Sequence, residues 1–325
     1  MRPRWMIAAV PAMFCLMALL GWSACTGCSG KDAQAKAAAT RDAGSADEED
    51  PFLLPRHLPV YYPPVELGVN TGKIDRRNRY LSAVRVFAKG IGAPKTVRVC
   101  SGVLVSPRLV LTAASCVCSP QPPAQGDGGQ TLLDAKVCAS IGLVDTTNYF
   151  PRDRHGPAGS DGSEYEAAVR VHPAFKQVLD EKGNVVSSEA NLAVFVLDKA
   201  AEIPPVELAE SDVNAGESLV VVGHGYTRDT VDVERVFSEH RVTEVLNSSG
   251  RVAFAQPPPF VYKGARGGPC LRQNRQGLRL SGILSASVGQ EALFTSVYAY
   301  RDWVRAEIQG AADAGTSMPQ PPVSP

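Results

Sequence analysis

The stretch CSGVLVSPRLVLTAASCV, which runs from Cys100 to Val117, contains two apolar runs separated by the turn-forming residues 106–108. Short apolar or alternating runs bounded by turn residues are typical of β-strands. Long polar stretches at Ser119–Gly129 and Asn148–Ser163 are interpreted as surface loops. The pattern predicts an all-β fold, either a sandwich or a pair of barrels. The predicted strands are Ala83–Phe87, Val97–Val105, Leu109–Ala113, Ala135–Val144, Ala167–Val171, Leu192–Leu197, Leu219–Val222, Val236–Leu246, Arg251–Ala255 and Leu278–Leu284.

The composition limits the size of the core and the class of partner. The chain has 325 residues, of which 44% are hydrophobic, with 29 glycines and 25 prolines. That is enough apolar material for a sizeable core with many turns. The formal net charge is zero, so no long-range field favours nucleic acid, and we expect no nucleic-acid partner.

The N-terminus has the features of an export signal over residues 1–24. A basic end is followed by the apolar run Met6–Leu20 and by small residues at 23 and 24. Cys25 resembles the acylated cysteine of bacterial lipoproteins, although Trp22 stands where leucine is usual, and Cys28 is a rival. An ordinary cleaved signal or a single anchor helix is the alternative. We therefore expect an exported protein, either anchored in the membrane of the cell envelope by a lipid or free in the periplasm or outside the cell.

Three further segments follow the signal. Residues 25–66 form a predicted flexible tether, first rich in Ala and Asp and then in Pro, because few large apolar side chains offset the ordering entropy. Its Pro51–Pro64 part is either an extended strip on the domain or a peptide-like ligand for a partner. The regular domain is expected over 67–309, and 310–325 as a disordered tail. A helix is predicted near the end of the domain, capped by Ser296, with Val297, Tyr300, Val304 and Ile308 on one face.

Four anchors, in order along the chain, carry a resemblance to the trypsin-like (chymotrypsin-type) serine protease family. They are the stretch from Cys100 to Cys116, the VHP of Val171–Pro173, the VGHGYT of Val222–Thr227, and SGILSA…LFTSVYAYRDWV from Ser281 to Val304. The resemblance covers roughly Leu67–Gln309. It implies a chymotrypsin-like double β-barrel with a C-terminal α-helix.

The three positions of that family's catalytic triad are all recognisable, and each holds another residue. Ser115 stands for the histidine of TAAHC, Asn191 for the aspartate, and Arg266 for the serine of GDSGGP. A serine hydroxyl is no general base near neutral pH, and a neutral amide does not stabilise an imidazolium. Arginine offers only donors and is no nucleophile. The resemblance therefore implies an inactive homologue with no catalytic residue.

Other parts of the family's site are changed too. The resemblance places the oxyanion hole at the backbone N–H groups of Gly264 and Arg266, and the pocket floor at Phe260. Ala265 replaces the aspartate that pairs with a freed N-terminus in active members, and no IVGG-like activation site precedes Cys100. Tyr262 replaces a pocket-bracing cysteine. A filled or rebuilt specificity pocket is the expectation.

The cysteines and histidines have candidate structural and chemical roles. The resemblance implies a disulfide between Cys100 and Cys116, and a local Cys118–Cys138 disulfide is a further candidate, which leaves Cys270 as a buried free thiol. No histidine shows metal-ligand spacing with another His, Cys or carboxylate. We expect structural or solvated histidines, no metal and no cofactor. The five histidines are His57, His155, His172, His224 and His240.

These observations favour an exported pseudoprotease that serves as a binding or regulatory module for a protein or peptide. A serine-type endopeptidase with a non-standard catalytic set and a structural envelope lipoprotein are the alternatives. Within the preferred interpretation, Gly264 and Arg266 either hold a carboxylate or other anion, or Arg266 fills the old cleft, paired to an acid of the domain.

Overall fold

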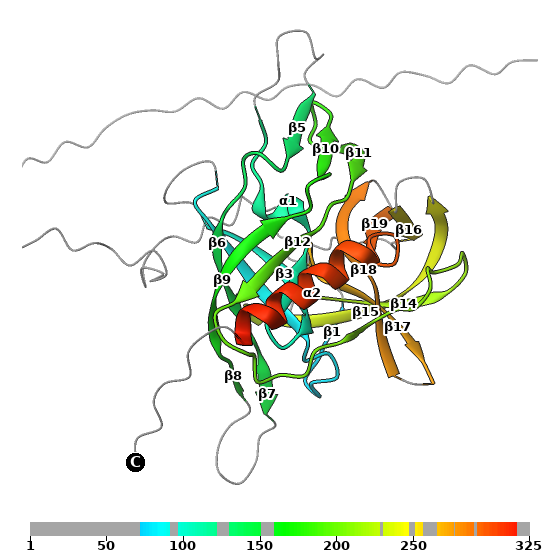
Figure 1. Ribbon diagram of the computed structural model, residues 1–325. Helices are drawn as coiled ribbons and strands as arrows, with labels where there is room; N and C mark the ends of the chain where they lie inside the picture. The colour runs from blue at the N-terminus through cyan, green and yellow to red at the C-terminus, as the bar shows by residue number, and fades with distance from the viewer. Residues whose placement is uncertain are drawn as a thin grey trace, which may run out of the picture. The chain divides into compact units, whose positions relative to one another are not determined.

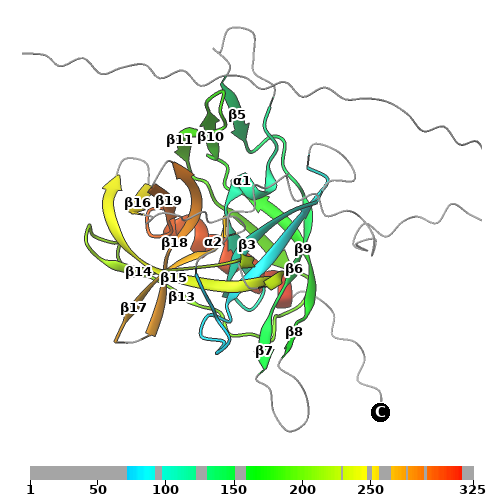
Figure 2. The same cartoon turned by 180° about the vertical axis from the view of Figure 1, so that it is seen from behind.

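The computed structural model describes residues 72–91, 97–121, 130–150, 159–227, 230–246, 251–255, 265–275, 277–288 and 291–316. These residues form two closed β-barrels (Figures 1 and 2), so the predicted all-β double barrel is confirmed. The export signal predicted at 1–24, the tether at 25–66 and the last part of the predicted tail, 317–325, lie outside the described residues.

The first barrel is built from strands whose side chains alternate between core and solvent. In β9 (Glu164–Val171), Tyr165, Ala167 and Val169 are buried while Glu164 and Arg170 are exposed. This period of two is the pattern expected for a strand with one face on a core. The barrel closes in the order β12-β4-β3-β2-β6-β9. Its other strands are β2 (Ala83–Lys89), β3 (Val97–Ser106), β4 (Leu109–Thr112), β6 (Ile141–Asp145) and β12 (Ala193–Leu197).

The second barrel closes because one long strand pairs on both of its edges. β15 (Thr230–Leu246) pairs with β14 and also with β16, which returns through β19, β18 and β17 to β14. Its interior holds a core of its own, which includes Leu219, Val221 and Phe294. The remaining strands are β14 (Ser218–Thr227), β16 (Arg251–Ala255), β17 (Pro269–Asn274), β18 (Gly277–Val288) and β19 (Glu291–Ser296).

Several short strands lie outside the two closed barrels. Figures 1 and 2 both show a small three-stranded sheet that stands apart from them, in the order β11-β10-β5. The prediction of a surface loop over Asn148–Ser163 is wrong in part, because the two ends of this segment pair as a hairpin and Tyr149 is buried. The short strands are β1 (Lys73–Ile74), β5 (Thr131–Asp134), β7 (Asn148–Phe150), β8 (Gly159–Asp161), β10 (Lys176–Leu179), β11 (Val185–Glu189) and β13 (Glu207–Leu208).

The described residues contain two helices, α1 (Ala114–Val117) and α2 (Arg301–Thr316). The C-terminal helix was predicted, but its bounds differ from the prediction. Ser296 Oγ accepts from the backbone N–H of Ala299 at 3.2 Å, so it caps a turn that precedes α2. The helix continues past Gln309 to Thr316, because Ala311 is fully buried and alanine has the highest helix propensity. Of the described helices, neither is long and apolar enough to span a membrane.

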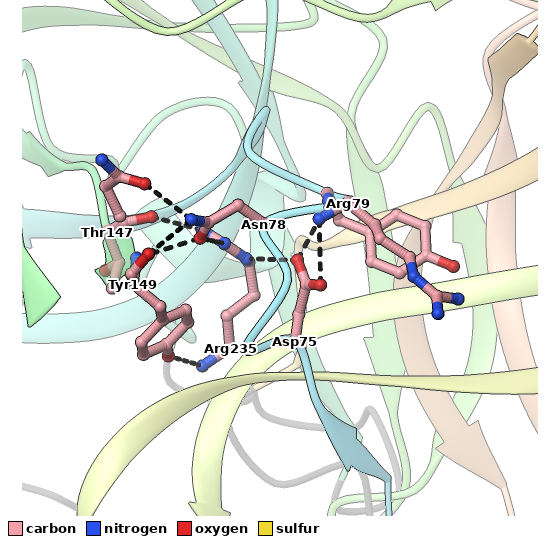
Figure 3. Close-up of polar contacts among 8 residues, drawn as sticks. Asp75, Asn78, Arg79, Thr147, Tyr149 and Arg235 are labelled. Atoms are coloured by element: carbon pink, nitrogen blue, oxygen red, sulfur yellow. Dashed lines mark hydrogen bonds and ion pairs between the residues drawn. The ribbon is translucent and has the colours of Figure 1, made fainter. Parts of the chain in front are cut away.

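A buried ion pair lies where β1 and β15 meet the first barrel (Figure 3). Arg235 Nε donates to Asp75 Oδ2 at 3.0 Å, and the two side chains are 0% and 1% exposed. The Asp75 carboxylate also accepts from the backbone N–H groups of Arg79 and Tyr80 at 3.0 and 2.9 Å. Every oxygen of this buried carboxylate therefore has a donor.

The Arg235 guanidinium is satisfied in the same way by the elements that surround it. Nη1 donates to the carbonyl of Thr147 at 2.5 Å, and Nη2 donates to Asn78 Oδ1 at 2.8 Å. The Arg235 backbone N–H donates to the Tyr149 hydroxyl at 2.7 Å, and burial raises the pKa of Tyr149 to about 12. A buried charge pair is tolerated when its remaining donors and acceptors find partners, as they do in this Asp75–Arg235 cluster.

Candidate functional site

The positions predicted for base and acid, Ser115 and Asn191, are bonded to each other. Ser115 lies in α1, and Asn191 lies just before β12. The Ser115 backbone N–H donates to Asn191 Oδ1 at 2.8 Å, and Asn191 Nδ2 donates to Ser115 Oγ at 3.2 Å. Both residues are buried. The pair is neutral and contains no group that titrates near neutral pH.

Asn191 is held in place by its neighbour and by the segment that leads into α2. Ala190 has φ +44°, a left-handed conformation that costs free energy for a residue with a Cβ. Its backbone N–H donates to the Tyr300 hydroxyl at 3.0 Å, and burial raises the pKa of Tyr300. The C-terminal segment therefore fixes the chain on which the amide of Asn191 is mounted.

The turn that carries Arg266 packs its backbone against β3. The Ser101 backbone N–H donates to the Arg266 carbonyl at 2.8 Å. Gly267 follows with φ +82°, and a Cβ there would overlap Thr112 Oγ1 and the Ser101 carbonyl oxygen. Only glycine fits such a position. Arg266 itself is exposed. The three residues Ser115, Asn191 and Arg266 are called the replaced centre below.

A second arginine, Arg98 of β3, lies beside α1 and was not singled out from the sequence. Its Nη1 donates to the carbonyls of Ser115 at 3.1 Å and Cys118 at 2.7 Å. Burial lowers the pKa of Arg98, and the positive charge of Arg266 lowers this pKa further. Arg98 thus lies beside the replaced centre, which itself contains Arg266. In the sequence, Arg98 sits between Val97 and Val99, where it looks like the polar residue of an alternating strand.

Two disulfides brace the segment around α1. The predicted Cys100–Cys116 disulfide is confirmed, and the candidate Cys118–Cys138 disulfide is formed as well. Cys270 is a buried free cysteine, and burial raises the pKa of its thiol. A thiol held in the protonated form is a weak nucleophile. Cys270 thus fits the structural role expected for it.

His172 and His224 both lie in environments that fit a structural role. The His172 ring lies edge-on to Trp303, 4.8 Å between centroids, and its Nδ1 accepts from the backbone N–H of Ala174 at 3.1 Å. His224 is 2% exposed, and neither of its ring nitrogens has a hydrogen-bond partner among the described residues. Burial, followed by the charges of Arg235 and Arg85, lowers the pKa of His224 well below its ordinary value. Burial lowers the pKa of His172 as well, which favours the neutral form of both rings.

His240 makes a serine–histidine contact that sequence reasoning did not find. Its Nε2 lies 2.7 Å from Ser238 Oγ, and both side chains belong to β15. Residues two apart on a strand point to the same face, which brings them together. The contact lies outside the replaced centre in sequence and in the sheet order. No signal other than this i, i+2 spacing would have found it.

Several predicted site residues lie outside the described part of the chain. They include Gly264 of the oxyanion hole, the pocket residues Phe260 and Tyr262, and the lipidation candidates Cys25 and Cys28. His57 and His155 lie outside it too. Among the described residues, no group of three or more His, Cys, Asp or Glu side chains is arranged to hold a metal ion.

No curated protein matches the chain. A structure of GrC is 14% identical, with a TM-score of 0.52 over 74% of this chain and 100% of that chain, which is a likeness of fold. Human heparin binding protein is 19% identical, with a TM-score of 0.47 over 79% of this chain and 100% of that chain. A mutant of the same human protein is 20% identical, with a TM-score of 0.48 over 78% and 100%.

The family is shown by the sequence match. The trypsin-like peptidase domain matches residues 100–280, more than half of the 325 residues. The matched range holds Ser115, Asn191 and Arg266, together with both disulfides and strands of both barrels. The chain belongs to the family of the trypsin-like peptidase domain.

Proposed function

We propose that this trypsin-like domain is catalytically inactive and serves as a binding or regulatory module for a protein or peptide. The observation that carries the proposal is the reciprocal hydrogen bonding of Ser115 and Asn191. A triad needs a base that takes the nucleophile's proton and an acid that orients the base. Here those two positions satisfy each other as a hydroxyl, an amide and a backbone N–H.

The third position supports the same proposal. Arg266 carries no lone pair that attacks a carbonyl near neutral pH, because its guanidinium stays protonated. Yet the turn keeps its packing through the Ser101–Arg266 hydrogen bond and the glycine at 267. A scaffold that keeps the packing of this turn and lacks the reactive groups is suited to recognition without turnover.

Export is part of the proposal. Two disulfides braced on α1 suit an oxidising compartment, because thiols are kept reduced in the cytosol. We further propose that the mature chain is tethered to the cell envelope through a lipid on Cys25, with Cys28 as the alternative. Mass spectrometry of the mature N-terminus tests this. An acylated cysteine at position 25 or 28 supports the proposed lipid tether, and an unmodified N-terminus created by plain cleavage contradicts it.

A fluorophosphonate probe tests catalytic inactivity directly, because it labels only serines that a neighbouring base activates. The expected result is no adduct by intact-mass measurement, with active trypsin labelled in parallel. The Ser238→Ala variant is the sharpest control, since Ser238 makes the serine–histidine contact described above. Labelling of a serine that disappears when that one serine is substituted would replace the proposal with a peptidase that uses a non-standard catalytic set.

A further inference from the structure

Two arginines, Arg98 and Arg266, border the short helix α1. Arg98 Nη1 is bonded to the Ser115 carbonyl, and the Arg266 carbonyl oxygen lies 3.7 Å from Cys116 Sγ, so both residues border α1. The charge of Arg266 also acts on Arg98, whose pKa it lowers. No carboxylate of the described residues forms an ion pair with either guanidinium, although seven other arginines of the described part are paired.

Two like charges held together without an anion cost free energy, and the cost falls when an anion lies between them. The interpretation of Arg266 as a plug paired to an acid finds no such acid in the described part of the chain. Ser115 and Asn191 are neutral and supply no negative charge. The arrangement therefore favours an anion from outside the described part of the chain.

Arg98 is already positioned to bind. Two backbone carbonyls hold its Nη1, at 3.1 and 2.7 Å, while its Nε and Nη2 donate to no described residue. A guanidinium fixed through one nitrogen loses little side-chain entropy when its other donors meet an oxygen pair. Arg266 supplies the second cation; its side chain is exposed, although desolvation lowers the pKa of its guanidinium.

The chemistry indicates a single small anion. Two guanidinium groups match one carboxylate, whose two oxygens accept paired N–H donors. An extended polyanion needs a broad basic surface, and the formal net charge of this chain is zero. We propose that Arg98 and Arg266 together form a carboxylate site that binds the C-terminal carboxylate of a peptide or protein partner. The inference rests on the proposed binding function and names the chemistry that the site recognises.

Calorimetry with two matched peptides tests the site. The probes are acetyl-tri-alanine with a free C-terminal carboxylate and the same peptide with a C-terminal amide, each titrated at millimolar concentrations into the full-length protein. The variants are Arg266→Gln and Arg98→Gln, with Arg305→Gln as a matched control on an exposed face of α2. Circular dichroism and urea unfolding of each variant verify that it is folded before titration.

The expected result is binding of the carboxylate peptide alone, weakened at least tenfold by Arg266→Gln and by Arg98→Gln and unchanged by Arg305→Gln. If Arg98→Gln fails to fold, the comparison of carboxylate with amide and the Arg266→Gln variant decide the matter. Equal heats for carboxylate and amide, no heat from either, or full affinity in Arg266→Gln overturns the inference. Such an outcome leaves the proposal of inactivity untouched, because the fluorophosphonate result is measured separately.

Discussion

The Asp75–Arg235 cluster and the replaced centre with its neighbour Arg98 both place arginine beside buried polar groups. Only the first of them pairs its arginine with a carboxylate among the described residues. Arg235 is 0% exposed, and its guanidinium meets a carboxylate, a carbonyl and an amide oxygen. Among the described residues, Arg98 donates to two carbonyls and to no acid, and Arg266 is exposed with no acid beside it. Each guanidinium nitrogen of Arg235 donates to a partner in the domain. Arg98, in contrast, has nitrogens that donate to no described residue.

The difference separates a structural role from a binding role. A buried charge whose partners are all supplied by the domain contributes to one folded arrangement and offers nothing to a ligand. Cations left without an acid raise the electrostatic free energy of the folded domain, and an anion that binds to them lowers it again. On this basis we assign stability to Arg235 and recognition to Arg98 and Arg266.

Removing the cation of the complete cluster should have the largest effect. Arg235→Leu leaves the Asp75 carboxylate buried without its ion-pair partner and should cost about 3–5 kcal/mol in the free energy of unfolding. Urea unfolding measures it. The control is Arg279→Leu, which breaks a pair whose Glu207 is 74% exposed and should cost less than about 1 kcal/mol. Similar losses in the two variants would contradict the structural role of Arg235.

The neutral pair of the replaced centre should show a smaller, asymmetric loss. Asn191→Leu removes the acceptor of the buried Ser115 N–H and should cost about 1–3 kcal/mol. Ser115→Ala keeps that backbone bond and removes the acceptor of Asn191 Nδ2, whose bond is longer at 3.2 Å, so it should cost about 1 kcal/mol, the low end of the same range. The same urea measurements apply. If Ser115→Ala were the more damaging change, the hydrogen bonding described for this pair would be wrong.

His224 next to Arg235 should make the domain sensitive to acid. Its pKa in the folded state is lowered below its ordinary value, so the unfolded chain binds the extra proton. Stability from this group is present above about pH 6.5 and falls below it by at most roughly 1.4 kcal/mol per pH unit. Urea unfolding at a series of pH values tests this. His224→Phe should flatten the dependence between pH 6.5 and 5, and an unchanged slope would exclude His224 as its source.

The smallest expected effect is an increase in the free energy of unfolding, not a loss. Arg266→Gln removes one of two neighbouring like charges and should raise the free energy of unfolding by about 0.5 kcal/mol or less at low salt, because solvent screens an exposed charge. Thermal unfolding in an anion-poor buffer detects the rise, which should shrink as salt is added. Arg305→Gln serves as the reference. A clear loss of stability in Arg266→Gln would instead indicate a partner acid for Arg266.

Much of the fold was predictable because the strands of the barrels are apolar or alternating. β12 reads AVFVL and β3 reads VRVCSGVLVS, and both lie where the sequence predicted them. The predicted run Ala135–Val144 became a strand only from Ile141, because a turn and the Cys118–Cys138 disulfide occupy its first half. β10 and β11 were missed, since KQVL and VVSSE carry weak patterns and depend on pairing with each other.

The contacts within the candidate site were not predictable from the sequence. The assignment of the triad positions to Ser115, Asn191 and Arg266 stays a prediction from the resemblance, and residue types alone do not say that the first two bond each other. Arg98 and Asp75 come close to their partners only through the fold. Arg235 lies 160 residues from Asp75 in sequence, and no local pattern links the two.

The central claim is that the replaced centre does no hydrolysis, and a peptide-library digestion followed by mass spectrometry tests it most directly. The purified full-length protein, at neutral pH and after separation from host proteases, is predicted to leave the library uncut beyond the buffer blank. Cleavage that proceeds through many turnovers, and that disappears when Ser115, Arg266 or Ser238 is substituted in a folded variant, would contradict the claim.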